Sequence, residues 1–438
     1  MTVYVGIDDT DSQTGMCTTY LASELIKEFE EYDLIGYPRL VRLNPNIPWK
    51  TRGNGAICLH FGKGRGRNFP VCRIGNKDYL AFERGNGNLS PDEFEEGVAK
   101  IVESHFMTDD RNTNPAFVVL SRKPTSSLYW RAVRGIVYLE DVKELVSDNG
   151  IYRLYKNGRG LIGATSAVSW RPRDRTYEII TYRQREKWGT QRMLKKSSVI
   201  AMDKKFKSTF NNYDYEEDNI TIAPNSPCPV LFGIRGDNPK DLVPAMSAIR
   251  GEKAQRWTIF LTNQGTDEHL VKRRIRDIAK NQSVIVDGTV VERPRRILGG
   301  HLIFRISDGD DVDCAAYEPS KKFREVVTHL REGDELTVYG SVRDKPRTVN
   351  VEKLQIHSLA AIKKKQGNPE CPQCGKRMKS AGSNAGYRCR KCHVHAKEGM
   401  AKRITVRRPI SPGFYEPTVS ARRHLSKPLK RIQNRPTC

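Results

Sequence analysis

Two groups of residues near the ends of the chain are of types that do chemistry. Close to the start, the run Gly6–Ser12 places three carboxylates, Asp8, Asp9 and Asp11, within four residues. Close to the end, four cysteines follow the spacing C-x₂-C-x₁₄-C-x₂-C, namely Cys371, Cys374, Cys389 and Cys392. Carboxylates are the oxygen ligands that Mg²⁺ takes, and paired thiolate knuckles are typical of zinc. The sequence therefore predicts one magnesium site and one zinc site.

The carboxylates lie where a strand gives way to a helix. Residues 2–7 alternate between apolar and other side chains, which predicts a strand ending at Asp8. The helical spacing of apolar residues over 18–32 predicts a helix beginning near Thr18. Three carboxylates crowded at this point are costly unless a cation neutralises them, and Mg²⁺ with a nucleoside triphosphate is the natural occupant. A helix cap within a solvated acidic turn is the alternative, and the residues alone leave both open.

The four cysteines predict a closed structural zinc ribbon. A Cys₄ site leaves no open coordination position, so no zinc catalysis is expected. His393 and His395 follow the last cysteine and are expected to be surface residues. Basic residues surround the knuckles and are expected to contact nucleic acid: Lys376, Arg377, Arg388, Arg390 and Lys391.

A glycine-rich run, Gly158-Arg159-Gly160-Leu161-Ile162-Gly163, matches G-x-G-x-x-G. It lacks the clear preceding strand and the later acidic residue of a dinucleotide site, so a Rossmann cofactor is excluded. A turn that approaches phosphate and opens a helix over 161–170, with Arg159 as a charge clamp, is one interpretation; a packing turn is the other. No Gly-x₄-Gly-Lys-Ser/Thr run occurs, so any ATP site is not of the common P-loop type.

The charge of the chain favours a polyanionic partner. Its 438 residues carry 75 Lys+Arg against 51 Asp+Glu, a formal net charge of +24. Residues 362–438 alone hold 20 Lys/Arg and three Asp/Glu, the footprint of a segment that follows a phosphate backbone. A merely soluble basic protein is the alternative. The chain shows no membrane span or signal peptide, and its ten cysteines include no disulfide framework, so a cytoplasmic protein is expected.

The length predicts several domains. We expect a multidomain α/β and α+β protein, with an α/β catalytic domain split between 1–61 and 151–222 around a smaller α+β unit at 62–150. A mobile loop is expected at 62–68, and a strand near 199–202. The remaining divisions are an α/β connecting segment at 223–281, a barrel at 282–358, the zinc ribbon at 366–400 and a basic segment at 401–438. The order β-β-β-α-β-β over 282–358 is that of an OB-fold, which commonly grips single-stranded nucleic acid; a purely structural barrel is the alternative.

Taken together, these motifs resemble the archaeal tRNA(Ile) 2-agmatinylcytidine synthetase family over nearly the whole chain. The resemblance rests on the carboxylate run, the glycine-rich run, the four cysteines and several further motifs. The further motifs are Gly15–Leu21, Arg42–Pro45 with Lys50–Ala56, Pro227–Leu231 with Gly233–Gly236, Pro412–Glu416 and Ala421–Leu429. The resemblance implies a kinase-like ATP domain, an inserted ferredoxin-like domain, an OB-fold and a zinc ribbon.

The resemblance also implies a reaction. The C2 oxygen of the wobble cytidine, in an isoleucine tRNA with a CAU anticodon, is replaced by agmatine through a phosphorylated cytidine, with ATP cleaved to AMP. The tRNA then reads AUA. Asp8, Asp9 and Asp11 are expected to be catalytic and to hold Mg²⁺, and Thr18 is implied to be phosphorylated by the enzyme itself.

Further residues are assigned on the same basis. ATP is expected to meet Gly6, Asp8, Arg52, Gly158, Arg159, Gly160, Gly163 and Asp203. If the loop after residue 203 supplies a metal ligand, Asp203 or Asp214 must serve. In the basic C-terminal segment, Arg422, Arg423 and Lys427 are expected to contact RNA. Agmatine carries a guanidinium and an amine, so its pocket should offer carboxylates, which are not assigned.

Two other classes of protein remain open on the sequence. One is a non-catalytic RNA-binding factor that uses only the OB-fold and zinc ribbon. The other is a nuclease that uses the aspartates with a metal, and it would shorten RNA without requiring ATP. Asp8→Asn separates the enzyme from the binding factor, because it should abolish ATP turnover and leave RNA affinity nearly intact.

Overall fold

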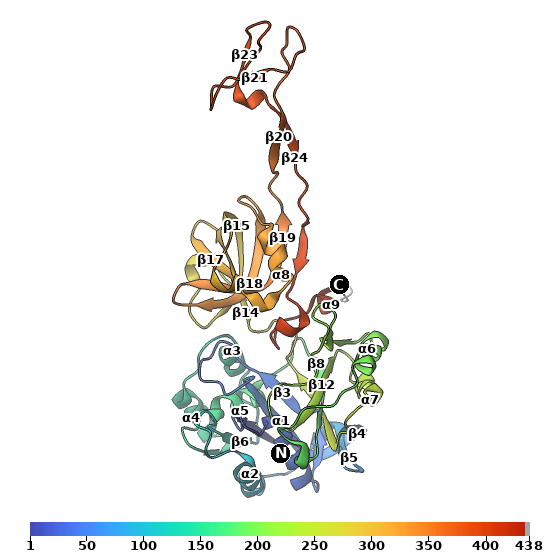
Figure 1. The fold of residues 1–438 in the computed structure, drawn as a ribbon. Helices are drawn as coiled ribbons and strands as arrows, with labels where there is room; N and C mark the ends of the chain where they lie inside the picture. The colour runs from blue at the N-terminus through green and yellow to red at the C-terminus, as the bar shows by residue number, and fades with distance from the viewer. Residues whose placement is uncertain (434–438) are drawn as a thin grey trace.

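The computed structural model describes residues 1–433, so residues 434–438 of the expected basic segment lie outside the described residues. Three bodies follow one another along the molecule (Figure 1). We call residues 1–269 the N-terminal body, residues 270–358 the barrel, and residues 368–401 the ribbon. The chain then returns past the barrel, and its last helix, α9 (Leu429–Gln433), lies against the N-terminal body.

The N-terminal body is built on one large sheet. Its main path runs β7-β6-β1-β4-β3-β13-β8-β12-β9, with β2 and β5 paired beside β4. The strands are β1 (Val3–Asp8), β2 (Asp33–Ile35), β3 (Arg39–Arg42), β4 (Gly55–Ile74), β5 (Lys77–Asn86), β6 (Ala116–Leu120), β7 (Gly150–Leu154), β8 (Thr176–Tyr182), β9 (Thr209–Phe210), β12 (Val230–Gly236) and β13 (Arg256–Thr262). The hairpin of β10 (Tyr213–Asp214) and β11 (Asn219–Ile220) stands apart.

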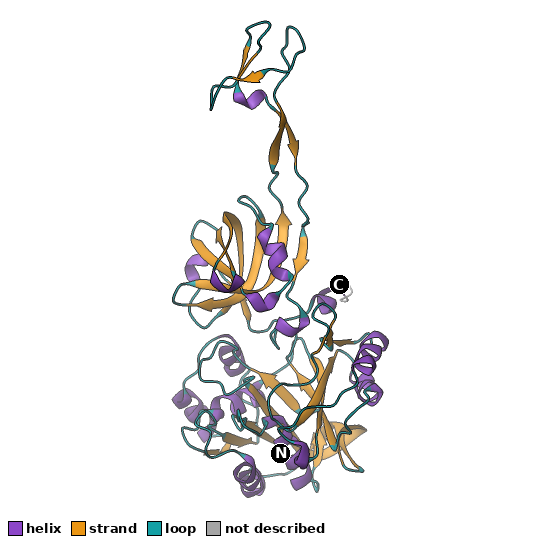
Figure 2. Cartoon of the chain, viewed as in Figure 1, coloured by secondary structure: helices purple, strands orange, loops and turns teal. Residues whose placement is uncertain are grey.

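Helices cover both faces of this sheet (Figure 2). They are α1 (Thr18–Glu28), α2 (Asp92–His105), α3 (Ser127–Arg134), α4 (Leu139–Ser147), α5 (Gly160–Ser169), α6 (Lys196–Lys205) and α7 (Leu242–Ala248). Side chains of β1 alternate between the two faces, as in any strand. Val3, Val5 and Ile7 pack in one core with α1 and α2, whereas Tyr4 packs in the other core with α3 and α5. Asp8 shares the face of Tyr4, so its carboxylate points toward α5.

The structure differs from the expected division of this body. The expected boundary between 61 and 62 falls inside β4, whose glycine- and arginine-rich stretch 62–68 is strand paired with β5. Residues 62–150 are not a separate insert, because β6 pairs with β1 over five residues. The sheet is also mainly antiparallel: β1 runs opposite to both of its neighbours, so this body is α+β in character.

Residues 199–202 form part of helix α6, although the sequence predicts a strand there. The short apolar run Val199–Met202 does not distinguish the two by itself. In the structure, Ser198, Val199 and Met202 are the buried residues of α6, and this spacing of three and four lies on one helical face. Packing against α7 and β10 therefore selects the helix.

The barrel has the strand order of an OB-fold. Its strands are β14 (Leu270–Lys272), β15 (Ser283–Arg296), β16 (Leu302–Ser307), β17 (Asp311–Ala316), β18 (Glu335–Arg343) and β19 (Thr348–Ser358), with helix α8 (Phe323–Thr328) between β17 and β18. Pairing of β15 with β18 closes the barrel, and β17 runs parallel to β19. A core that includes Val284, Phe304 and Val338 fills it.

A narrow arm carries the ribbon away from the barrel. The arm is the antiparallel pair of β20 (Lys363–Gly367) and β24 (Lys402–Thr405), and the ribbon holds β21 (Lys379–Ser380), β22 (Tyr387–Arg388) and β23 (His395–Ala396). On its return the chain adds β25 (Gly413–Tyr415) to the edge of β19. No helix within residues 1–433 is long and apolar enough to cross a membrane.

Candidate active site

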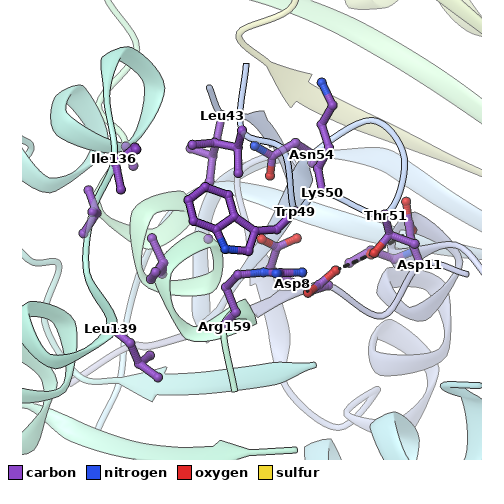
Figure 3. A pocket seen from close by; sticks show the side chains of 18 of the residues that line it. Asp8, Asp11, Leu43, Trp49, Lys50, Thr51, Asn54, Ile136, Leu139 and Arg159 are labelled. Carbon is purple, nitrogen blue, oxygen red and sulfur yellow. Dashed lines mark hydrogen bonds and ion pairs between the residues drawn. The ribbon is translucent and has the colours of Figure 1, made fainter. Parts of the chain in front are cut away.

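A cavity of about 490 Å³ opens in the N-terminal body beside the end of β1. One wall is polar and the opposite wall is apolar (Figure 3). The polar wall contains Asp8, Asp9, Asp11, Thr18, Thr51, Arg52 and Arg159. The apolar wall contains Leu43, Ile47, Trp49, Ile136, Val137, Tyr138, Leu139 and Ile162. The expected carboxylate cluster therefore lies in the wall of a cavity that is large enough for a small ligand.

Asp8 is held at the back of this cavity by close packing against α5. The residue is 8 % exposed, and a Cβ built on Gly163 would overlap its Oδ2. Burial, with the neighbouring Asp9 carboxylate, raises the pKa of Asp8 well above its usual value. The glycine-rich run thus provides the space that the Asp8 carboxylate occupies.

Asp9 and Asp11 bind to opposite partners around the cavity. Asp9 has a positive φ of 58°, and its carboxylate accepts a hydrogen bond from Thr51 Oγ1 at 2.9 Å and forms an ion pair with Arg159 at 3.2 Å. Burial raises the pKa of Asp9 to about 6, although Arg159 opposes the rise. Asp11 forms an ion pair with Arg52 at 3.2 Å. Each of these carboxylates is thereby fixed in direction.

Thr18 is the first residue of α1, and its hydroxyl is tied to the carboxylates. The Thr18 amide donates to Asp11 Oδ1 at 2.6 Å, and the Thr18 hydroxyl donates to the same oxygen at 2.9 Å. The Thr10 hydroxyl donates to Thr18 Oγ1 at 3.0 Å. A hydroxyl whose proton already points at a carboxylate is arranged for removal of that proton.

Other expected ligands of ATP are placed differently. Gly6, Gly158 and Gly160 pack behind the cavity rather than in its lining: a Cβ on Gly6 would meet the backbone of Ala164, and Gly158 adopts a positive φ of 66°. Asp203 lies on α6, outside the lining, and accepts hydrogen bonds from Asn212 and Tyr215. The alternative ligand, Asp214, accepts from the backbone of Ser420. The structure therefore brings Asp8, Arg52, Arg159 and Gly163 together at the cavity, without Asp203.

The sequence analysis missed most of the apolar wall. Trp49 is 45 % exposed and Tyr138 is 70 % exposed, both at the cavity. Figure 3 shows Trp49 between the side of Ile136 and Leu139 and the side of Asp8 and Asp11. Residues 132–139 fall within the stretch that the sequence predicts as a separate insert, so their local pattern does not link them to the carboxylates. The signal that could have found them is the helix expected at 128–137, which the structure contains as α3.

The four cysteines of the ribbon converge as expected. Their sulfur atoms lie within 4.8 Å of one another, and Cys374 Sγ is 3.6 Å from Cys389 Sγ. The Cys392 backbone N–H donates to Cys389 Sγ at 3.4 Å, and this bond leads the effects that lower the pKa of Cys389 to about 6. Thiolates at this spacing fit a tetrahedral Zn²⁺. The nearby Lys376, Arg377, Arg388, Arg390 and Lys391 are all exposed.

Three basic residues of the C-terminal segment are paired within the protein rather than left free for RNA. Arg422 pairs with Glu416 at 2.8 Å, and Lys427 with Asp174 at 2.8 Å. Arg423 donates to Asn46 Oδ1 at 2.8 Å and to Ser341 Oγ at 2.9 Å. Our expectation of RNA contacts did not foresee this, because the sequence does not show that this segment folds back between the barrel and the N-terminal body.

The fold and the site define a multidomain protein in which a carboxylate-lined cavity is joined to an OB-like barrel and a Cys₄ zinc ribbon. Family models match three stretches: the TiaS TCKD domain at residues 4–158, the TiaS FLD domain at 158–269 and the TiaS C-terminal zinc ribbon domain at 368–410. The boundary near residue 158 differs from the expected split, since the first model is continuous across 62–150.

Full-length relatives agree with these models. The chain is 43 % identical to the tRNA(Ile) 2-agmatinylcytidine synthetase TiaS of Methanocaldococcus jannaschii, over 98 % of this chain and 99 % of the relative. It is 40 % identical to the enzyme of the same name from Archaeoglobus fulgidus, over 99 % and 98 %. The chain belongs to the tRNA(Ile) 2-agmatinylcytidine synthetase family.

Solved structures of the family share this fold. A complex of TiaS with its isoleucine tRNA and ATP superposes with a TM-score of 0.84 at 39 % identity, covering 98 % of this chain and 97 % of that chain. A complex of TiaS with the same tRNA, AMPCPP and agmatine gives a TM-score of 0.80 at 36 % identity, with the same coverage.

Proposed function

We propose that this protein joins agmatine to the wobble cytidine of an isoleucine tRNA with a CAU anticodon, at the expense of ATP. The observation that carries the proposal is the placement of Asp8, Asp9, Asp11 and Thr18 along one wall of a single cavity whose other wall is apolar. Full-length identity to the named relatives supports the substrates. In this proposal ATP and the cytidine meet in that cavity, and the product tRNA reads AUA.

The carboxylate wall fits Mg²⁺. Asp8 and Asp9 both have raised pKa values because burial penalises their charge, and a divalent cation removes that penalty. Asp8, Asp9 and Asp11 together offer only hard oxygen donors, the set that Mg²⁺ prefers. When bound, the cation would offset phosphate charge. Arg52 and Arg159, in the same wall, would orient the phosphates.

Thr18 is proposed to accept a phosphoryl group. Its hydroxyl donates to Asp11, so Asp11 takes the proton as the oxygen attacks phosphorus. The position at the first turn of α1 supplies backbone N–H groups that favour a phosphate there. A cytosine C2 oxygen is a poor leaving group, and its phosphorylation makes displacement by the agmatine amine feasible.

The barrel and ribbon are proposed to hold the tRNA. The five exposed cations of the ribbon, Lys376, Arg377, Arg388, Arg390 and Lys391, are free to meet phosphates, whereas Arg422, Arg423 and Lys427 serve to hold the C-terminal segment in place. We propose a division of the catalytic half at residue 158, after the family models, with both parts sharing one sheet.

The test is mass spectrometry of nucleosides from a CAU-anticodon tRNA incubated with the protein, Mg-ATP and agmatine. A cytidine heavier by the agmatinyl group, formed only with ATP, is expected. Asp8→Asn should abolish it while tRNA binding persists. Thr18→Val should lower it by about 100-fold or more, the scale of losing an acid–base or nucleophilic group, and Thr18→Ser should retain most of it. Unmodified cytidine with intact tRNA binding would leave an RNA-binding factor.

A further inference from the structure

A second cavity, of about 560 Å³, lies between the barrel and the N-terminal body. Its barrel side is formed by the turn between β18 and β19, with Arg343, Asp344 and Lys345, and by Lys280. Its other side is formed by Pro45, Asn46 and Pro48 of the loop that follows β3.

The loop between β3 and β4 is a wall shared by the two cavities. Pro45, Asn46 and Pro48 line the second cavity. Ile47, Trp49 and Lys50 line the first. A single stretch of chain therefore separates them. The Lys50 ammonium donates to the Pro45 carbonyl, which ties the two sides of the wall together.

The wall is attached to the barrel. Asn46 Nδ2 donates to Ser283 Oγ at 2.9 Å, and Asn44 Nδ2 donates to the Asn281 carbonyl at 2.9 Å. Arg423 bridges Asn46 and Ser341 of β18. The second cavity is thus built from parts held in a fixed relation, and a ligand in it lies one loop away from the first cavity.

The charges of the second cavity suit an anion. Four cationic side chains line it, Lys280, Arg343, Lys345 and Arg423, against one carboxylate, Asp344. Lys280 lies 3.7 Å from Asp344, and Arg423 is engaged by Asn46, Ser341 and Glu352. Lys345 makes no hydrogen bond or ion pair within residues 1–433, and Arg343 donates only to the Tyr317 hydroxyl. Cations that converge on a concave surface attract phosphate.

The turn between β18 and β19 connects the fourth and fifth strands of the OB-fold. In this fold, that turn is one of the places where oligonucleotides bind. Since the wall is one stretch of chain thick, a nucleotide in the second cavity would be a near neighbour, along the strand, of a nucleotide in the first.

We propose that the second cavity binds an RNA nucleotide flanking the cytidine that enters the first cavity, with Lys345 and Arg343 on its phosphate. This inference rests on the proposed function for the identity of the RNA. It assigns to the β18–β19 turn the role of setting which nucleotide of the loop reaches the carboxylates.

The test measures binding of full-length protein to CAU-anticodon tRNA without ATP or agmatine. Lys345→Ala should weaken binding about 3- to 10-fold and reduce the slope of log affinity against log salt by about one. Lys345→Arg should restore both. Lys100→Ala, which removes the same charge from exposed α2 on the side away from the barrel, should change affinity less than 2-fold, about the limit of such measurements.

A tRNA with one methylphosphonate beside the target cytidine locates the contact. The neutral linkage should weaken binding to the wild-type protein and have no further effect on Lys345→Ala, whereas a methylphosphonate in the acceptor stem should affect both proteins equally. Equal penalties at the flanking position would overturn the proposal. So would a change in binding of ATP alone in Lys345→Ala, which would mark a second ATP site. Because binding is read without catalysis, failure of agmatine transfer leaves this result interpretable.

Discussion

Gly163 of α5 faces the carboxylate of Asp8 at the end of β1 so closely that no side chain fits between them. The contact joins the glycine-rich run to the acidic run, which are 155 positions apart, and it sets where the Asp8 carboxylate can lie. Both residues line the same cavity.

Gly163→Ala is therefore expected to displace Asp8 and lower agmatine transfer by about 10- to 100-fold, because small misplacements of catalytic groups are costly. Overpacking should also reduce the free energy of unfolding by about 1–3 kcal/mol. Gly399→Ala is the matched control, since a Cβ there meets nothing within 4 Å. Rates under saturating substrates and thermal unfolding measure the two effects, and an unchanged rate would show that Asp8 does not need its present position.

Asp9→Asn is expected to stabilise the protein at neutral pH when no divalent cation is present. The folded pKa of Asp9 is about 6, above its unfolded value, so the folded state holds the proton more tightly. Its free energy of unfolding therefore falls as the pH rises from about 4 to about 6. The variant avoids this loss, and about 1–3 kcal/mol is expected from a shift of this size.

Thermal unfolding in a chelator at pH 4 and pH 7.5 measures this effect. The melting temperatures of the two proteins should nearly coincide at pH 4 and separate at pH 7.5, with the variant higher. Added Mg²⁺ should narrow the gap by stabilising only the wild-type protein. A variant that is less stable at pH 7.5 would show that the bonds from Thr51 and Arg159 outweigh the burial of the charge.

Arg423→Ala is expected to loosen the loop that lines the first cavity. The guanidinium links Asn46 of that loop to Ser341 of the barrel, and its loss leaves polar partners unsatisfied at about 1–3 kcal/mol. The kcat for agmatine transfer should fall more than the affinity for tRNA. Arg423→Lys should recover part of the rate, and Arg67→Ala, whose side chain is 88 % exposed, is the control. Equal losses of rate and affinity would indicate a direct RNA contact instead.

Removal of zinc is expected to weaken tRNA binding and leave the N-terminal body folded. The ribbon is joined to the barrel only through β20 and β24, so its unfolding has no packing route to the sheet. Cys374→Ser should lower tRNA affinity by about 10-fold or more, since several phosphate contacts are lost together, and flatten the salt dependence. Calorimetry should show the transition of the N-terminal body unchanged; a shifted transition would reveal an additional contact.

Local sequence determined the elements that depend on near neighbours. The alternation over 2–7, the helical spacing after Thr18 and the cysteine spacing predicted β1, α1 and the zinc site, because a strand face, a helix face and a knuckle are each set by residues a few positions apart. The strand pattern of 282–358 likewise predicted the OB-like barrel, whose pairing follows chain order except for its closing contacts.

Only the tertiary structure decided what lies opposite these elements. The pairing of β6 with β1 joins residues more than 100 positions apart, and it placed 132–139 in the apolar wall rather than in a separate insert. The return of the C-terminal segment gave Arg422, Arg423 and Lys427 partners within the protein. Such contacts depend on which surfaces bury each other over the whole chain, and composition and local spacing carry no record of that choice.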